Sequence, residues 1–96
     1  MQLFMIRRRS GWGSPAELEA AAKRSTEVAD ESYPDDIRWI RSYVVDEGDG
    51  TLGTFCVYEA SSAEKIREHA GDVGTPADDI TPIADTVVIR PDPVAA

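Results

Sequence analysis

The sequence has one cysteine and one histidine among its 96 residues, and both scarcities limit its chemistry. A single cysteine excludes an intrachain disulfide and any Cys-x-x-Cys metal or redox motif. Because Cys56 lies between Phe55 and Val57, we expect a buried thiol in a reducing compartment, which favours a cytoplasmic protein. With His69 as its one imidazole, any catalytic or metal site built by this chain alone must be sparse.

Positive charge is also in short supply. Ten Lys and Arg residues face 18 Asp and Glu residues, which gives a formal net charge of -8. Such a surface repels phosphate backbones, so we expect no nucleic-acid partner. No apolar run approaches the about 20 residues that span a bilayer, and the bases Arg7–Arg9 follow a short apolar run, the reverse of a secretory signal. We therefore expect no membrane partner.

Two similar tetrapeptides give the sequence its main organising signal. Ser14-Pro15-Ala16-Glu17 is followed later by Ser61-Ser62-Ala63-Glu64, and each begins with residues that favour a helix N-terminus. The expected Ser14 interaction is a hydrogen bond to the backbone of Glu17, with Glu17 reaching back to Ser14. The second helix is expected to end near Gly74-Thr75-Pro76, where Gly and then Pro occur in the usual order.

Each predicted helix lies between two extended runs. Strand-like residues precede the helices at Leu3–Ile6 and Phe55–Ala60, and they follow them at Ile37–Val45 and within Ile80–Arg90, chiefly Thr86–Arg90. The glycine-rich stretch from 46 to 53 predicts a hairpin loop between the two central strands. The order strand-helix-strand therefore occurs twice in the chain.

This order predicts an α+β fold of the ferredoxin-like βαββαβ type. Its four-stranded antiparallel sheet would carry both helices on one face. Residues 1–90 would form a single domain, and 91–96 a flexible C-terminal tail.

The second face of the sheet is expected to be covered by another copy of the chain. Leu3–Ile6, Phe55–Tyr58 and Val87–Ile89 lack the apolar-polar alternation of a half-solvated strand. Because two helices cannot cover both faces, we expect a homodimer of the dimeric α/β-barrel-like type, with a semi-enclosed space between the sheets.

Three residues are candidate metal ligands. His69 lies at the edge of the apolar stripe of the second helix, Glu59 ends a strand, and Cys56 lies on the same strand. Carboxylate, imidazole and thiolate suit divalent transition metals. Each also has a structural interpretation, since His69 and Cys56 can simply fill the core and Glu59 can interact with the positive end of a helix dipole.

A second candidate site is an aromatic row on the second strand. Trp39, Arg41 and Tyr43 alternate and are expected to share one face, where they would line a pocket or stack in a dimer interface. Because Arg7, Arg8 and Arg9 are consecutive on a strand, they cannot form one cluster, and pairing with acids is their expected use.

Several ordered motifs resemble a small bacterial family of unknown function whose named representative is a nickel-binding protein. They are Ile37-Arg38-Trp39, Ser42-Tyr43-Val44, Cys56-Val57-Tyr58-Glu59-Ala60, Ile66-Arg67-Glu68-His69-Ala70 and Gly74-Thr75-Pro76-Ala77. The resemblance runs from about Leu3 to Ile83. It implies a ferredoxin-like dimer and the binding of nickel or a related divalent metal, with His69 as the first residue to carry over and Glu59 and Cys56 as nearby candidates.

The leading hypothesis is therefore a non-enzymatic homodimer that binds a divalent metal, nickel first, in a sequestering or sensing role. One alternative is a cofactorless small-molecule enzyme of the monooxygenase or isomerase type, with His69 as acid or base beside Trp39 and Tyr43. A structural module without a ligand is the third. Phosphate-binding loops, His-Glu-x-x-His and nucleophile elbows do not occur in the sequence.

Overall fold

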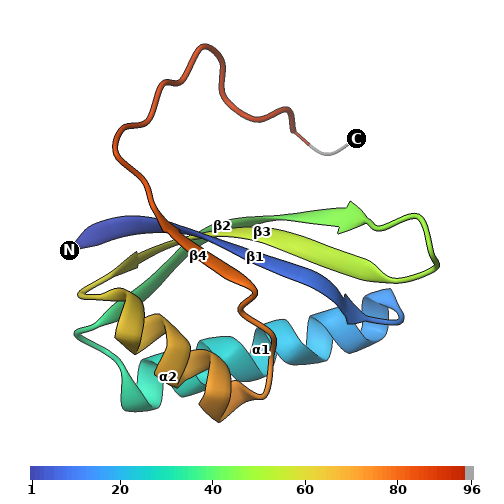
Figure 1. The fold of residues 1–96 in the computed structure, drawn as a ribbon, viewed down its shortest axis with the longest axis horizontal. Coiled ribbons are helices and arrows are strands. Elements are labelled where there is room, and N and C mark those ends of the chain that lie inside the picture. The colour runs from blue at the N-terminus through green and yellow to red at the C-terminus, as the bar shows by residue number, and fades with distance from the viewer. Residues whose placement is uncertain (95–96) are drawn as a thin grey trace.

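A computed structural model describes residues 1–94 and shows four strands and two helices (Figure 1). The elements in chain order are β1 (Gln2–Trp12), α1 (Pro15–Ser32), β2 (Ile37–Asp46), β3 (Leu52–Ala60), α2 (Ala63–Val73) and β4 (Asp79–Pro82). Within the described residues, neither helix is long and apolar enough to cross a membrane.

The strands form one antiparallel sheet in the order β2-β3-β1-β4. Both helices lie on the same side of this sheet, so the molecule has a helical layer and a sheet layer (Figure 1). The predicted α+β, ferredoxin-like arrangement is confirmed. Below, the helix face is the side of the sheet that packs against α1 and α2, and the open face is the other side.

Both helices begin where the tetrapeptides predict. The Ser14 hydroxyl accepts a hydrogen bond from the Glu17 amide at 3.3 Å, and Ser62 accepts one from the Lys65 amide at the same distance. The Glu17 carboxylate reaches one residue further back than expected, to the Gly13 amide at 2.6 Å. Gly74 ends α2 at a φ of 85°, a conformation that costs glycine little.

The last strand differs from the prediction. We expected it to span Ile80–Arg90, but β4 ends at Pro82. β4 runs antiparallel to β1 toward its start, and the Ile83 amide already reaches the Leu3 carbonyl at 2.9 Å. Because β1 begins at Gln2, no further partner remains for the β-prone Thr86–Arg90 segment, and Val87–Ile89 are left 65 to 80% exposed.

The first strand also differs, because it extends through the turn expected at Ser10–Gly13. β1 reaches Trp12, which pairs with Leu52 after an irregularity beyond Arg8. Ser10 has a positive φ of 49° at this irregularity. A bulge of this kind absorbs extra residues without ending the pairing of the two strands, so a turn-like sequence can lie inside a strand.

A second bulge changes the faces of β2. Trp39 pairs with Tyr58 and Arg41 with Val57, which leaves Ile40 without a register partner. A bulged residue shifts the alternation by one position, so Trp39 lies on the helix face while Arg41 and Tyr43 lie on the open face. The prediction that all three share one face is wrong.

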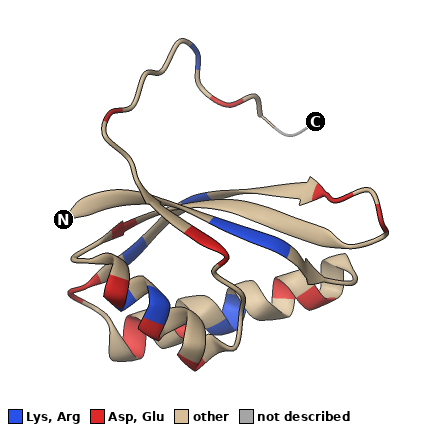
Figure 2. Cartoon of the chain, viewed as in Figure 1, with Lys and Arg blue, Asp and Glu red and all other residues tan. Residues whose placement is uncertain are grey.

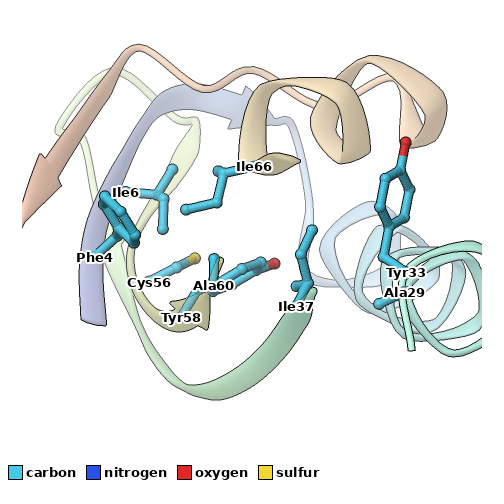
Figure 3. Close-up of a cluster of buried hydrophobic side chains, with 9 residues drawn as sticks. All are labelled: Phe4, Ile6, Ala29, Tyr33, Ile37, Cys56, Tyr58, Ala60 and Ile66. Atoms are coloured by element: carbon cyan, nitrogen blue, oxygen red, sulfur yellow. The ribbon is translucent and has the colours of Figure 1, made fainter. Parts of the chain in front are cut away.

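The core lies between the helix face and the two helices (Figure 3). Phe4 and Ile6 from β1 meet Cys56, Tyr58 and Ala60 from β3 there. The other buried members of the cluster are Ala29, Tyr33, Ile37 and Ile66. These alternate positions on β1 and β3 are the ones that a half-covered sheet requires.

The open face remains apolar at its centre. Leu3, Met5, Tyr43, Phe55 and Val57 share it through the strand register, and Tyr43 and Phe55 are 44% and 38% exposed.

The chain's own C-terminal segment, residues 83–94, also passes over the open face (Figure 1). It touches the sheet through Asp92, which accepts hydrogen bonds from Tyr43 at 2.8 Å and from Arg41 at 3.2 Å. The expectation that only a second copy could lie over this face therefore needs correction. Residues 95 and 96 of the predicted tail fall outside the described residues.

Candidate functional site

His69 lies almost completely buried on α2, with 1% of its surface exposed. Its Nε2 is 2.9 Å from the Ser25 carbonyl oxygen on α1. The ring also meets the aromatic rings of Tyr33 and Tyr58, with centroids 5.6 and 6.1 Å away. These contacts fix the orientation of the imidazole between the two helices and the sheet.

The hydrogen bond to Ser25 determines which nitrogen of His69 is free. A carbonyl oxygen can only accept, so Nε2 carries the proton and Nδ1 presents a lone pair. Within residues 1–94, Nδ1 is buried and has no hydrogen-bond partner. Burial lowers the pKa of His69 below 6.5, and the positive charge of Arg8 adds to this effect, while the Ser25 bond opposes it. The imidazole is therefore neutral at pH 7.

The three predicted metal ligands do not come together. Cys56 is buried on the helix face, with its thiol 3.2 Å from the Thr54 hydroxyl. Glu59 lies on the open face, where its carboxylate accepts a hydrogen bond from Arg38 at 3.0 Å. Glu59 and His69 are thus on opposite sides of the sheet. Among residues 1–94, no three His, Cys, Asp or Glu side chains form a group that could hold a metal ion.

The predicted aromatic pocket is also divided. His69, Trp39 and Arg41 line a cleft of about 550 Å³ between α1 and β2. Tyr43 lines another depression, on the open face, together with Arg41 and Val87. Of the two aromatic residues proposed for an enzymatic pocket, Trp39 therefore lines the same cleft as His69, whereas Tyr43 does not.

The three consecutive arginines separate as expected, and two of them pair with acids. Arg7 donates to Glu47 at 2.7 Å and Arg9 to Asp79 at 2.7 Å, and the bond from Arg7 helps to lower the pKa of Glu47. Arg8 points to the helix face instead and is 3% exposed. Strand alternation predicts its separation from Arg7, but the sequence did not indicate that its charge is buried.

Charge is distributed unevenly over the elements (Figure 2). Acidic residues outnumber basic ones on both helices and occur in the hairpin loop after β2, while basic residues outnumber acidic ones on β1 and β2. On the open face, Arg7, Arg38 and Arg41 each meet a carboxylate within 3.2 Å. That face is therefore locally balanced even though the chain is strongly acidic.

Comparison with known proteins supplies the family. A family model described as nickel responsive protein SCO4226-like matches residues 4–83, most of the chain. The chain belongs to this SCO4226-like family. No curated protein sequence matches it. The predicted resemblance to a small family with a nickel-linked representative is confirmed.

A solved structure shares the fold. The crystal structure of SCO4226 from Streptomyces coelicolor A3(2) matches with a TM-score of 0.72 and 21% sequence identity, over 88% of this chain and 99% of that one. At this identity the likeness establishes the fold, which agrees with the sheet order and helix placement described above.

The candidate ligands fit a nickel ion only in part. His69 offers one neutral nitrogen without a partner, which is the form of imidazole that binds metals. Cys56 and Glu59 do not lie with it, and a complete site needs at least three or four donors. The described residues of one chain therefore provide a single ligand and not a closed metal centre.

Proposed function

We propose that the protein is a non-enzymatic homodimer that binds a divalent transition metal, nickel first, in a sequestering or sensing role. The observation that carries the metal part is the buried, unpartnered Nδ1 of His69 in a chain of the nickel responsive family. The dimer part rests on the apolar open face.

The open face supports pairing with a second copy. Its central side chains are apolar, and its arginines are neutralised by neighbouring carboxylates. Two copies that pair through their open faces would keep their acidic helical layers on the outside. The net charge of -8 on each chain would then oppose this association less than it would oppose a dimer formed through the helices. The exposed apolar side chains of Val87–Ile89 would also gain contacts in such a pair.

The metal part assigns the first ligand position to His69. A dimer formed through the open face cannot bring Cys56 or His69 of two chains together, because Cys56 lies on the helix face and His69 lies on α2, which packs against that face. Because Nδ1 is buried, a local rearrangement must open it to water or to further donors from the 550 Å³ cleft that His69 lines. We expect nickel binding weaker than that of a closed four-ligand site.

Calorimetric titration of the metal-free protein with nickel tests this assignment. We expect a binding heat in the wild type that is lost in His69→Gln and retained in Glu59→Gln and Cys56→Ala. Circular dichroism of each variant checks that the fold survives. An absence of heat in the wild type removes the metal part of the proposal, and retained heat in His69→Gln moves the ligand away from this residue.

A further inference from the structure

Arg8 is a buried cation without an anion. Its side chain is 3% exposed, and within residues 1–94 it has no carboxylate within 4.0 Å, in contrast to both neighbouring arginines. Its Nη1 donates to the Pro76 carbonyl, and its Nη2 lies 3.5 Å from the Tyr58 hydroxyl. A guanidinium keeps its charge at any physiological pH, so its burial beside neutral groups alone is costly.

An apolar pocket of about 230 Å³ opens at Arg8, between the first half of α1 and the helix face of the sheet. Its apolar walls consist of Trp12, Leu18, Ala21, Ala22, Trp39 and Val44. The hydroxyl-bearing residues Ser25, Ser42, Thr54 and Tyr58 belong to the same lining. The pocket thus combines an apolar body with a cationic group at one place in its wall, which is how small-molecule sites fix an orientation.

We propose that this pocket binds a small organic monocarboxylate whose apolar body fills the space between Trp12 and Trp39 and whose carboxylate pairs with Arg8. A carboxylate supplies the anionic partner that the guanidinium lacks among residues 1–94, and charge-assisted pairs of this kind are the strong ones in a dry site. The volume suits a single aromatic ring or a short aliphatic chain, since drug-sized ligands occupy larger pockets of about 300–1,000 Å³.

The one acidic residue in the pocket lining does not take the place of the proposed ligand. Glu19 on α1 is the one carboxylate among the lining residues, and it is exposed at the surface rather than paired with Arg8. The chain has 18 acidic residues, yet within residues 1–94 none of them lies within ion-pairing distance of the buried Arg8. The proposed carboxylate site requires neither a bound metal nor a second copy of the chain.

Both tryptophans of the protein line this pocket, so intrinsic fluorescence reports on its occupancy. We would titrate the protein with phenylacetate and, as a neutral match of the same shape, with phenylacetamide. Saturable quenching or a spectral shift is expected with phenylacetate, and binding of the amide should be about tenfold weaker or more, because it lacks the charge-assisted pair. Equal affinities for both compounds would overturn the role of Arg8.

Two variants and one matched control complete the test. Arg8→Met keeps an unbranched apolar stem and removes the charge, so phenylacetate should bind about tenfold weaker or more. Ala22→Leu fills the pocket while leaving Arg8 in place and should abolish binding. Arg67→Met, on the exposed side of α2, should bind as the wild type does.

Two results would contradict the carboxylate site. One is unchanged binding of phenylacetate in Ala22→Leu, which stays informative even if Arg8→Met does not fold. The other is sulfate binding as tight as phenylacetate binding, because that would remove the need for an apolar body. No fluorescence change with phenylacetate or with octanoate, an aliphatic match, would remove the proposal altogether.

Discussion

At the scale of single residues, the neutral buried His69 makes stability depend on pH. Its pKa is lowered in the folded state but near 6.5 in the unfolded chain, so the unfolded chain binds more protons between these two values. The free energy of unfolding should therefore fall as the pH drops below about 6.5, and level off below the folded pKa. Urea denaturation at several pH values between 5 and 7.5 measures this slope.

The matched variant for this prediction is His69→Gln, which cannot titrate. Its stability should be independent of pH in the same window, because the acids whose pKa is lowered, Glu47 and Asp49, titrate below it. The prediction fails if the wild type shows no slope between pH 5 and 6.5, or if the variant keeps the wild-type slope.

The buried arginine illustrates what the sequence could not show at this scale. Alternation correctly separates Arg7 from Arg8, because neighbouring residues on a strand point to opposite faces. Which face would be buried depends on the side of the sheet on which α1 and α2 pack, and alternation within β1 does not determine that side. The burial of His69, in contrast, could be inferred from nearby residues, because Ile66, Ala70 and Val73 form an apolar stripe beside it on α2.

At the scale of elements, two glycines with opposite surroundings test how the strands pack. A Cβ on Gly53 would lie 2.6 Å from the backbone oxygen of Arg8 and 2.8 Å from the Arg7 guanidinium. Gly53→Ala should therefore destabilise the protein by about 1–3 kcal/mol, because backbone cannot easily yield. It would also disturb the ion pair between Arg7 and Glu47.

Gly71 provides the control, because a Cβ there meets nothing within 4 Å and the residue lies inside α2. Gly71→Ala should stabilise the protein by about 0.5–1 kcal/mol through the lower entropy cost of alanine in a helix. Urea midpoints of both variants give the comparison. Two shifts of the same sign would contradict the strand contact at Gly53.

The sequence predicts elements well where the signal is local and poorly where it depends on a partner. Caps at Ser14 and Gly74 involve residues within a few positions and are confirmed, and the second helix begins at Ser62, one of the two serines of its tetrapeptide. The end of β4 depends on where β1 begins, and the bulge at Ile40 depends on the register with β3. Neither can be read from β-propensity, which is high in Thr86–Arg90 although it forms no strand.

At the scale of the whole molecule, the C-terminal segment bears on what covers the open face of the sheet. The segment contacts the sheet through Asp92, which accepts hydrogen bonds from Arg41 and Tyr43. Its apolar residues Val87, Val88 and Ile89 are nevertheless 79, 65 and 80% exposed. A second copy that packs on the open face would cover these side chains as well as Tyr43 and Phe55. The C-terminal segment and a second copy can then both cover the open face, so the position of the segment is compatible with the predicted homodimer.

The homodimer is the central claim of this account, and sedimentation equilibrium at micromolar concentration tests it most directly. We predict twice the chain mass for the wild type. An acid placed on the open face, Phe55→Asp, should shift the protein to the monomer, while Ala16→Asp on the exposed start of α1 should leave the dimer intact. A wild type that sediments as a monomer across the micromolar range would contradict the claim.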